Sequence, residues 1–209
     1  MAGAGKNVFV TILGRPNVGK SSLLNALVGE KIAAVSSKPQ TTRTKITGVL
    51  TRDEVQYVFI DTPGMHRSRD RLSEHMLKAI GSSLGSVDCV LLVADAQKKP
   101  NEAERELIRS LRQSGAPALL VINKIDLLEK KDMILPVIAE YSSLYPFDEC
   151  IPVSALSLDG LDRLLEIILR YSKEGPHYFP DDKFTDQPER VLISEMIREK
   201  LLELLSKEV

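Results

Sequence analysis

The sequence of 209 residues has no tryptophan, only two cysteines and three histidines, and no surplus of either charge. Cys89 and Cys150 lie in apolar, strand-like runs, which favours small buried side chains over a disulfide or a metal site. The 28 Lys and Arg residues nearly balance 29 Asp and Glu residues, which leaves a formal net charge of −1. The chain therefore lacks the global basic character typical of nucleic-acid-binding proteins, and any RNA site has to be local.

Long hydrophobic runs are missing as well. None approaches the ~20 apolar residues that cross a bilayer. Residues 1–6 are too short and too polar for a signal peptide. We therefore expect a cytoplasmic protein, at most associated peripherally with the inner face of the cell membrane.

The residues that are present alternate between apolar strands and amphipathic helices, and at 43% hydrophobic they can bury a sizeable core. We expect strands near residues 7–13, 44–52, 55–60, 87–94, 117–122 and 148–152, and helices near 20–28, 71–84, 101–114, 130–144 and 158–171. This order predicts an α/β fold of three layers, with a mostly parallel six-stranded sheet, helices on both faces and one antiparallel hairpin around residues 53–54.

Residues 14–21 (GRPNVGKS) match the phosphate-binding loop pattern G-x-x-x-x-G-K-[ST] of P-loop NTPases, between an expected strand and an expected helix. In such a loop the backbone N–H groups converge on a β-phosphate, Lys20 reaches the β- and γ-phosphate oxygens, and the Ser21 hydroxyl is a Mg²⁺ ligand. The alternative is an ordinary glycine-containing turn. The candidate phosphate-binding residues are Gly14, Arg15, Pro16, Asn17, Val18, Gly19, Lys20, Ser21 and Ser22.

A second motif, Asn123-Lys124-Ile125-Asp126, follows the apolar run 118–122 and indicates guanine. The Asp126 carboxylate can accept hydrogen bonds from guanine N1–H and the 2-amino group, a donor pair that adenine does not offer. Asn123 is expected to tie the segment to the phosphate loop, and the Lys124 stem to lie against the base. The alternative is that Asn123 and Asp126 cap a following helix.

Two shorter motifs complete the set. Asp61-Thr62-Pro63-Gly64 ends a predicted strand, where Asp61 can hold the water shell of Mg²⁺ and the Gly64 N–H can meet a γ-phosphate. The alternative is a common Pro-Gly turn. Farther on, the backbone N–H of Ala155 can reach guanine O6, unless Ser154 is simply a helix N-cap. The candidate residues of this last segment are Ser154, Ala155 and Leu156.

In this order the motifs resemble the translation-factor branch of the P-loop GTPases, and more closely the Era family. The resemblance is carried by residues 14–25 (GRPNVGKSSLLN), 38–43 (KPQTTR) and 61–66 (DTPGMH), and by a tail from 177–180 (HYFP) through 197–201 (IREKL). It implies hydrolysis of GTP to GDP and phosphate with Mg²⁺, and a role with the small (30S) ribosomal subunit and its RNA. It also implies a switch threonine on Mg²⁺, for which we favour Thr42 over Thr41.

The residue after Gly64 is Met65, which cannot position an attacking water as the glutamine of Ras-like proteins does. Related GTPases with an apolar residue here resemble this chain in having an asparagine at the position of Asn17, and they bind K⁺ beside the phosphates. K⁺ is one expectation, and Arg15 or Arg43 acting in cis is the other. The predicted catalytic residues are Lys20, Thr42, Gly64 and Asn17.

The composition changes after residue 171. We expect a GTPase domain over residues 1–171, a turn-rich linker over 172–187 and a helix over 188–209 that resembles the start of a KH-type RNA-binding domain. Its apolar stripe, Ile193, Ile197, Leu201 and Leu204, needs a partner surface or folds back on the GTPase domain. Without a KH sheet and clamp, we expect a monomer with weakened RNA binding. The same motifs also fit a tRNA-modifying or other assembly factor, or a nucleotide-gated binding module with little turnover.

Overall fold

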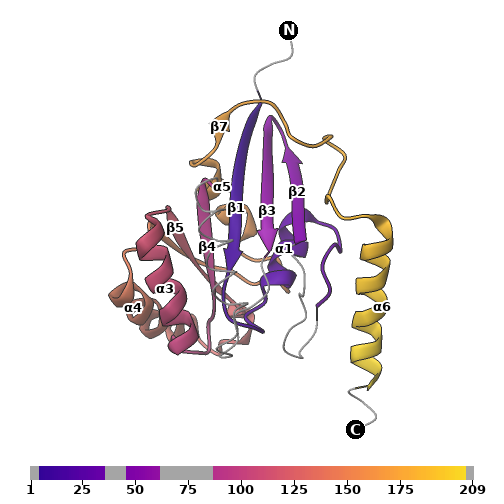
Figure 1. Ribbon diagram of the computed structural model, residues 1–209. Helices are drawn as coiled ribbons and strands as arrows, with labels where there is room; N and C mark the ends of the chain where they lie inside the picture. Colours follow the sequence, from indigo (N-terminus) through magenta and orange to yellow (C-terminus); the bar gives the residue numbers. More distant parts are fainter. Residues whose placement is uncertain (1–4, 36–45, 62–86, 206–209) are drawn as a thin grey trace.

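The computed structural model describes residues 5–35, 46–61 and 87–205. Its elements alternate as the sequence predicts (Figure 1). In chain order they are β1 (Lys6–Leu13), α1 (Lys20–Val28), β2 (Ile46–Arg52), β3 (Val55–Asp61), β4 (Cys89–Asp95), α3 (Glu102–Ser114), β5 (Ala118–Asn123), α4 (Leu135–Leu144), β6 (Glu149–Pro152), α5 (Leu161–Leu169), β7 (Lys173–Glu174) and α6 (Glu189–Leu205). The helix predicted over 71–84 lies outside the described residues.

The strands form one sheet in the order β2-β3-β1-β4-β5-β6, with β7 added beside β1. Only β2–β3 and β1–β7 pair antiparallel, and the other pairs are parallel. Every residue of β4 and β5 is buried, as expected for central strands of a sheet covered on both faces. The predicted α/β fold with a mostly parallel six-stranded sheet is thus confirmed, and the two-residue β7 is an addition that the sequence did not reveal.

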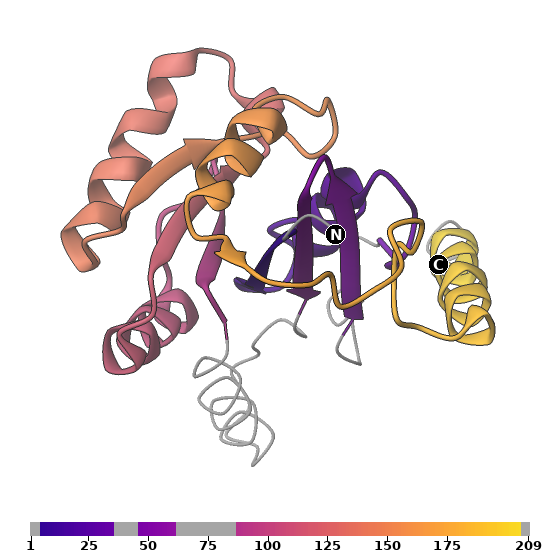
Figure 2. The ribbon, with the colours of Figure 1, turned by 90° about the horizontal axis from the view of Figure 1, so that it is seen from above.

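Two apolar layers cover the sheet (Figure 2). On one face α1 and α5 pack on β1, β3 and β4, with Leu23, Leu24, Leu164 and Ile168 completely buried. On the other face α3 and α4 pack on β4 and β5 around Leu107, Leu111 and Tyr141. The carboxyl ends of the parallel strands lie along one edge of the sheet, which is where open α/β sheets bind ligands.

Two predicted helices begin later than expected. The helix predicted over 130–144 starts as a 3₁₀ turn, Lys131–Ile134, and becomes α-helical at Leu135, because Pro136 is tolerated only in the first turn. The helix predicted over 158–171 begins at Leu161, after Gly160 takes φ 77°, a backbone conformation that favours glycine. The boundaries differ, but the elements are those expected.

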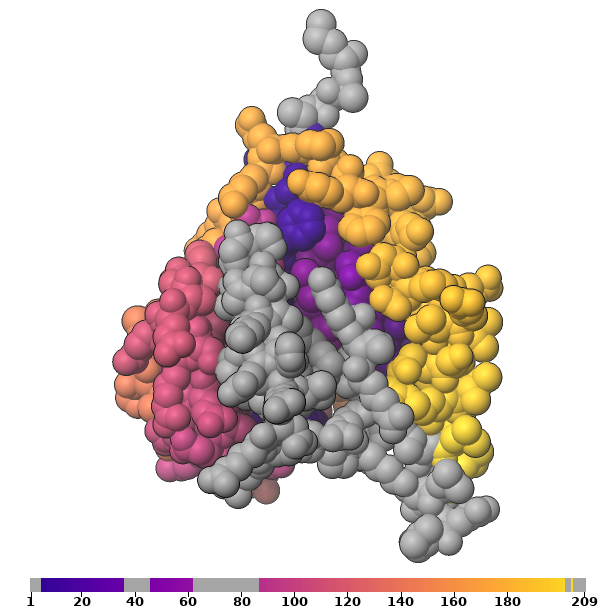
Figure 3. Space-filling model, viewed as in Figure 1, coloured from indigo at the N-terminus to yellow at the C-terminus, as the bar shows by residue number. Residues whose placement is uncertain are grey.

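The chain beyond residue 172 crosses one end of the sheet from β7 to the side of β2 and then turns into α6 (Figures 1 and 3). Phe184 O accepts a hydrogen bond from Val49 N, and Thr185 Oγ1 donates to Thr47 O at 2.6 Å, so this segment continues the sheet beyond β2. Helix α6 then lies outside both layers, beside β2 (Figure 2). No helix among the described residues is long and apolar enough to cross a membrane.

Candidate nucleotide-binding site

The phosphate loop joins β1 to α1 at the open edge of the sheet, and its glycines are required by close approaches. A Cβ at Gly14 would lie 2.5 Å from Val93 O, and one at Gly19 would lie 2.3 Å from Asn123 Nδ2. Gly19 has φ 96° and Asn17 has φ 64°, both in the left-handed region. The loop therefore curls tightly against β4 and β5, which brings its backbone to the mouth of the site.

Lys20 is buried at the start of α1, and its Nζ donates to the carbonyl oxygen of Arg15 at 3.0 Å. Burial lowers the pKa of Lys20, and the charge of Asp61 partly opposes this shift. An ammonium group held inside the loop gains from an anionic partner there, because removal from water strengthens electrostatic attraction.

The predicted Mg²⁺ ligands Ser21 and Asp61 meet although they come from α1 and β3. Ser21 Oγ donates to Asp61 Oδ2 at 3.1 Å. Mg²⁺ prefers hard oxygen ligands and usually keeps several waters, so a hydroxyl that binds it directly and a carboxylate that holds its water shell fit this metal. Elsewhere among the described residues, no group of three or more His, Cys, Asp or Glu side chains could hold a metal.

Asn123, at the end of β5, connects two motifs through its buried side chain. Its Nδ2 donates to Val18 O of the phosphate loop at 2.9 Å, and its Oδ1 accepts from Ala155 N at 3.0 Å. The Ala155 N–H that was predicted to reach guanine O6 is engaged here with Asn123. One amide thus fixes the phosphate loop relative to residues 154–156.

Lys124 adds a second connection. Its Nζ donates to Asn17 O at 2.6 Å and to Asp95 Oδ2 at 2.9 Å. Burial raises the pKa of Asp95, but hydrogen bonds from Lys124 and from the Gln97 N–H outweigh it, so that the pKa lies below the usual value. Sequence reasoning missed Asp95, and the only available signal was its place at the end of a wholly apolar strand.

Asp126 is exposed at the mouth of the site, and Ser154 Oγ donates to its Oδ1 at 2.5 Å. Neither residue is the N-cap of a described helix: the 3₁₀ helix after Lys124 has no side-chain cap, and Gly160 precedes α5. Ser154 Oγ does accept from the Ser157 N–H at 3.1 Å, a capping-type bond that closes a turn and not a helix. Leu156 is 83% exposed beside this loop.

The remaining predicted residues lie in or next to the phosphate loop, or outside the residues that the structure describes. Pro16 and Ser22 are partly exposed, and Val18 is buried. The Arg15 side chain lies against Glu104 of α3, with Nε 3.2 Å from the carboxylate. Outside the described residues lie Thr41, Thr42, Arg43, Thr62, Pro63, Gly64 and Met65.

GTPases of known families are similar to this chain in sequence. The family model described as a 50S ribosome-binding GTPase matches residues 9–124. The curated GTPase Era of Clostridioides difficile (strain 630) is 50% identical over 204 residues, which cover 98% of this chain and 69% of that protein. That of Geotalea uraniireducens (strain Rf4) is 50% identical over 201 residues, which cover 96% and 67%.

Solved structures agree with these matches. A single-residue variant of Aquifex aeolicus Era bound to GDP·AlF₄⁻ superposes with a TM-score of 0.85 at 38% identity, covering 93% of this chain and 66% of that one. Era in complex with MgGDPNP and nucleotides 1506–1542 of 16S ribosomal RNA gives 0.86 at 38% identity, covering 94% and 67%. The chain therefore spans about two thirds of the length of the relatives it matches.

Proposed function

The chain belongs to the Era family of P-loop GTPases, and we propose that it is a GTP-hydrolysing switch that acts in assembly of the small ribosomal subunit and processing of its RNA. It is a GTPase, which binds guanine nucleotide with Mg²⁺ and converts GTP and water to GDP and phosphate. The observation that carries the proposed site is the Asn123 side chain, which joins the phosphate loop to the loop of Ser154 and Ala155.

The base-binding part of the proposed site is formed by the exposed Asp126 and Leu156, the half-buried Lys124 and Ala155, and the buried Ser154. Asp126 accepts from guanine N1–H and the 2-amino group, while Ser154 keeps its carboxylate oriented. The Lys124 stem and the exposed Leu156 flank the base, and guanine O6 would share the Ala155 N–H with Asn123 Oδ1. Isothermal calorimetry with GTP and ATP tests this assignment, and equal affinities would refute it.

For the phosphates, we propose that the N–H groups of residues 14–19 and the Lys20 ammonium bind the β- and γ-phosphates. Lys20 then exchanges Arg15 O for phosphate oxygens. Ser21, Asp61 and Thr42 would hold Mg²⁺, which would neutralise negative charge on the bound phosphates. In the same motif as Thr62 and Pro63, the N–H of Gly64 is proposed to meet the γ-phosphate.

Because Met65 cannot orient water, another positive charge has to assist hydrolysis. We propose K⁺ held beside the phosphates by Asn17. Support comes from Arg15, whose side chain is already paired with Glu104. Replacing Na⁺ by K⁺ should raise turnover from a basal rate on the order of 10⁻⁴–10⁻³ s⁻¹. Asn17→Ala should abolish the rise, and equal turnover in both salts would exclude K⁺.

The ribosomal role is supported by a relative, since the Era structure with 38% identity to this chain holds a fragment of 16S ribosomal RNA. We propose that residues 1–171 are the GTPase domain, 172–187 the linker and 188–209 the start of a KH-type domain. Peripheral association with the inner membrane face stays a prediction that vesicle flotation tests.

Co-sedimentation with 30S subunits in GTP and in GDP tests the ribosomal role. We expect association that depends on the bound nucleotide. Lys20→Ala, which should not bind GTP, is the control. Turnover without any association, at physiological salt, would favour a GTPase from another assembly or tRNA-modification pathway.

A further inference from the structure

Glu104, in the first turn of α3, has a buried carboxylate, and a buried charge requires hydrogen-bond or ionic partners. It is 1% exposed, and its two oxygens have separate partners. Oε2 accepts from the Asn101 N–H at 3.0 Å, while Asn101 Oδ1 accepts from the Glu104 N–H at 3.1 Å. This reciprocal pair is a capping box, and it accounts for one oxygen only.

The other oxygen faces two segments outside α3. Tyr141 of α4 donates its hydroxyl to Glu104 Oε1 at 2.7 Å, and Arg15 Nε of the phosphate loop lies 3.2 Å from the same atom. The Arg15 N–H is not aligned with this oxygen as a hydrogen bond requires, so the contact is an ion pair. A capping box needs neither partner, which indicates a further role for this carboxylate.

Arg15 is held at both its side chain and its backbone. Its side chain, 16% exposed, faces Glu104, and its carbonyl oxygen accepts from Lys20 Nζ. The residue lies between Gly14, which is pressed against Val93 O of β4, and Asn17, whose carbonyl accepts from Lys124. The first half of the phosphate loop is therefore fixed at each of these points, and the Arg15 side chain is its connection to α3.

We propose that Glu104 is a positioning residue for nucleotide binding, which acts through Arg15 to hold the phosphate loop in the shape that receives the β-phosphate. The Arg15 charge is used in this contact and not at the γ-phosphate. Tyr141 keeps the carboxylate in place by donating to the same oxygen. This inference rests on the nucleotide site proposed above, and it adds residues from α3 and α4 to it.

The proposal predicts which kinetic constant changes. The β-phosphate is bound by the loop in the ground state and in the transition state, so a loosened loop weakens both equally. Removal of uniform binding raises KM and leaves kcat unchanged. An arginine that stabilises the γ-phosphate during transfer would instead lower kcat.

The test compares Glu104→Gln, Arg15→Gln, the double variant and Tyr141→Phe with two matched controls. Glu106→Gln is the control for Glu104, because Glu106 is exposed on the same helix, and Arg105→Gln is the control for Arg15. For each protein one measures dissociation of a fluorescent GDP analogue, KM and kcat for GTP, and the melting temperature. The amide of Glu104→Gln keeps an oxygen for the capping box, so α3 should remain folded.

We expect both single substitutions to speed GDP dissociation and raise KM roughly tenfold, the effect of losing a charged contact. The double variant should be no worse than either single one, since each residue acts through the other. Tyr141→Phe should have a smaller effect, and the controls none. Glu104→Gln that only lowers the melting temperature, or Arg15→Gln that lowers kcat at unchanged KM, would overturn the proposal.

Failure of the nucleotide site itself gives a different result. If the unmodified protein and Lys20→Ala bind GDP equally poorly, the site assignment fails before any variant of Glu104 is compared. If the unmodified protein binds and Lys20→Ala does not, the nucleotide site stands. Identical behaviour of Glu104→Gln and Glu106→Gln then refutes the positioning role alone.

Discussion

The open edge of the sheet and the chain beyond residue 172 are held together by different kinds of contact. At the nucleotide edge, side chains of particular types bind the backbone of other motifs, as Asn123 does with Val18 and Ala155. Beyond residue 172 the backbone itself makes many of the contacts, as in Val49 N to Phe184 O. Chemistry dictates residue identity in the first region, whereas a segment that extends a sheet by its backbone can have many sequences.

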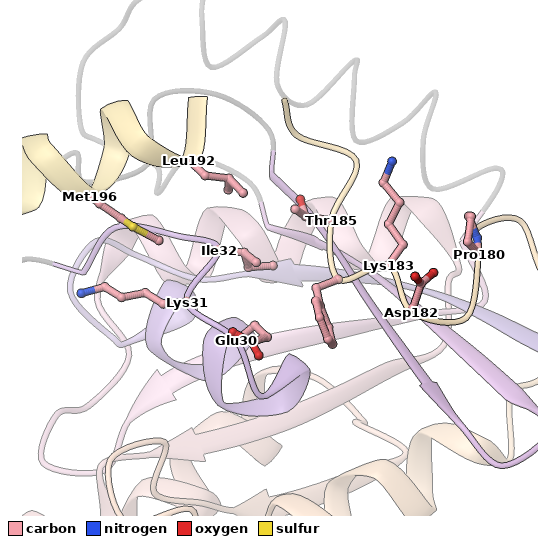
Figure 4. A pocket seen from close by; sticks show the side chains of 10 residues that line it. Glu30, Lys31, Ile32, Pro180, Asp182, Lys183, Thr185, Leu192 and Met196 are labelled. Atoms are coloured by element: carbon pink, nitrogen blue, oxygen red, sulfur yellow. The ribbon is translucent and has the colours of Figure 1, made fainter. Parts of the chain in front are cut away.

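In helix α6 the predicted apolar stripe does not make the contacts that hold the helix to the rest of the chain. Its predicted stripe exists, but it points away from the GTPase domain, with Ile193, Ile197, Leu201 and Leu204 between 49% and 60% exposed. The described contacts to the domain include Leu192, which packs on the core, and Glu199, which pairs with Lys31 at 2.6 Å and accepts from the Val35 N–H at 3.0 Å. Between α6 and residues 180–185 lies a cavity of about 400 Å³, lined by Ile32, Leu192 and Met196 (Figure 4).

The largest expected effect is the loss of GDP affinity in Asn123→Ala, which we compare with the same type of substitution, Asn7→Ala, in the other region. Asn123→Ala removes two buried hydrogen bonds, and we expect GDP affinity to fall by about 4 kcal/mol, roughly a thousandfold. Asn7→Ala removes one bond, from Asn7 Nδ2 to Pro176 O at 3.2 Å. It should cost about 1 kcal/mol of unfolding free energy and leave GDP affinity unchanged. Calorimetry and urea denaturation measure the two quantities, and equal losses of affinity would remove the distinction between the regions.

The next largest effect tests how the nucleotide edge selects guanine. Asp126→Asn puts a neutral amide against two guanine donors, so GTP affinity should fall by about 2–3 kcal/mol, or about a hundredfold. Xanthosine triphosphate, which has a carbonyl at position 2, should regain part of that loss. Competition binding with the two nucleotides measures this, and an unchanged preference for GTP would contradict the role of Asp126.

A smaller effect concerns the attachment of α6. Glu199→Gln keeps an acceptor for the Val35 N–H but removes the charge that attracts Lys31. We expect amide hydrogen exchange at Val35 to become roughly tenfold faster, because a buried carboxylate that accepts hydrogen bonds contributes about 1.5–3 kcal/mol. Glu189→Gln, an exposed position in the first turn of α6, is the control. Unchanged exchange at Val35 would mean that the charge of Glu199 does not help to hold α6 against this segment.

The sequence predicted that Asn123 ties its segment to the phosphate loop and that Ser21 and Asp61 lie together, because the motifs hold these residue types at fixed spacing. It could not predict Asp95 or the second role of Glu104, whose partners Lys124, Arg15 and Tyr141 are distant in sequence. The role of Gln56 could not be predicted from the sequence either. It is completely buried in β3, where it accepts from the N–H groups of Tyr178 and Phe179. Only the folded chain brings these groups together, and no local pattern records such contacts.

The smallest effect is a pH dependence confined to the region beyond residue 172. His177 Nδ1 lies 2.7 Å from Asp181 Oδ1, and its Nε2 lies 3.2 Å from Glu54 O. The bond to Asp181 raises the pKa of His177, and the contact with Glu54 O adds to this while partial burial opposes it. An imidazolium can donate to both oxygens, whereas a neutral ring can donate to only one.

The sign follows from a folded-state pKa that is higher than the unfolded one. The stabilisation is complete below about pH 6.5, the ordinary histidine value, and is lost as the pH rises through the raised folded-state pKa. The melting temperature of the protein minus that of His177→Gln should therefore shrink as the pH rises from 6 toward 8, while GDP affinity stays the same in both. An NMR titration that gives His177 a pKa at or below about 6.5, or no downward shift in Asp181→Asn compared with Asp182→Asn, would show that the contact with Asp181 does not stabilise the charged form of His177.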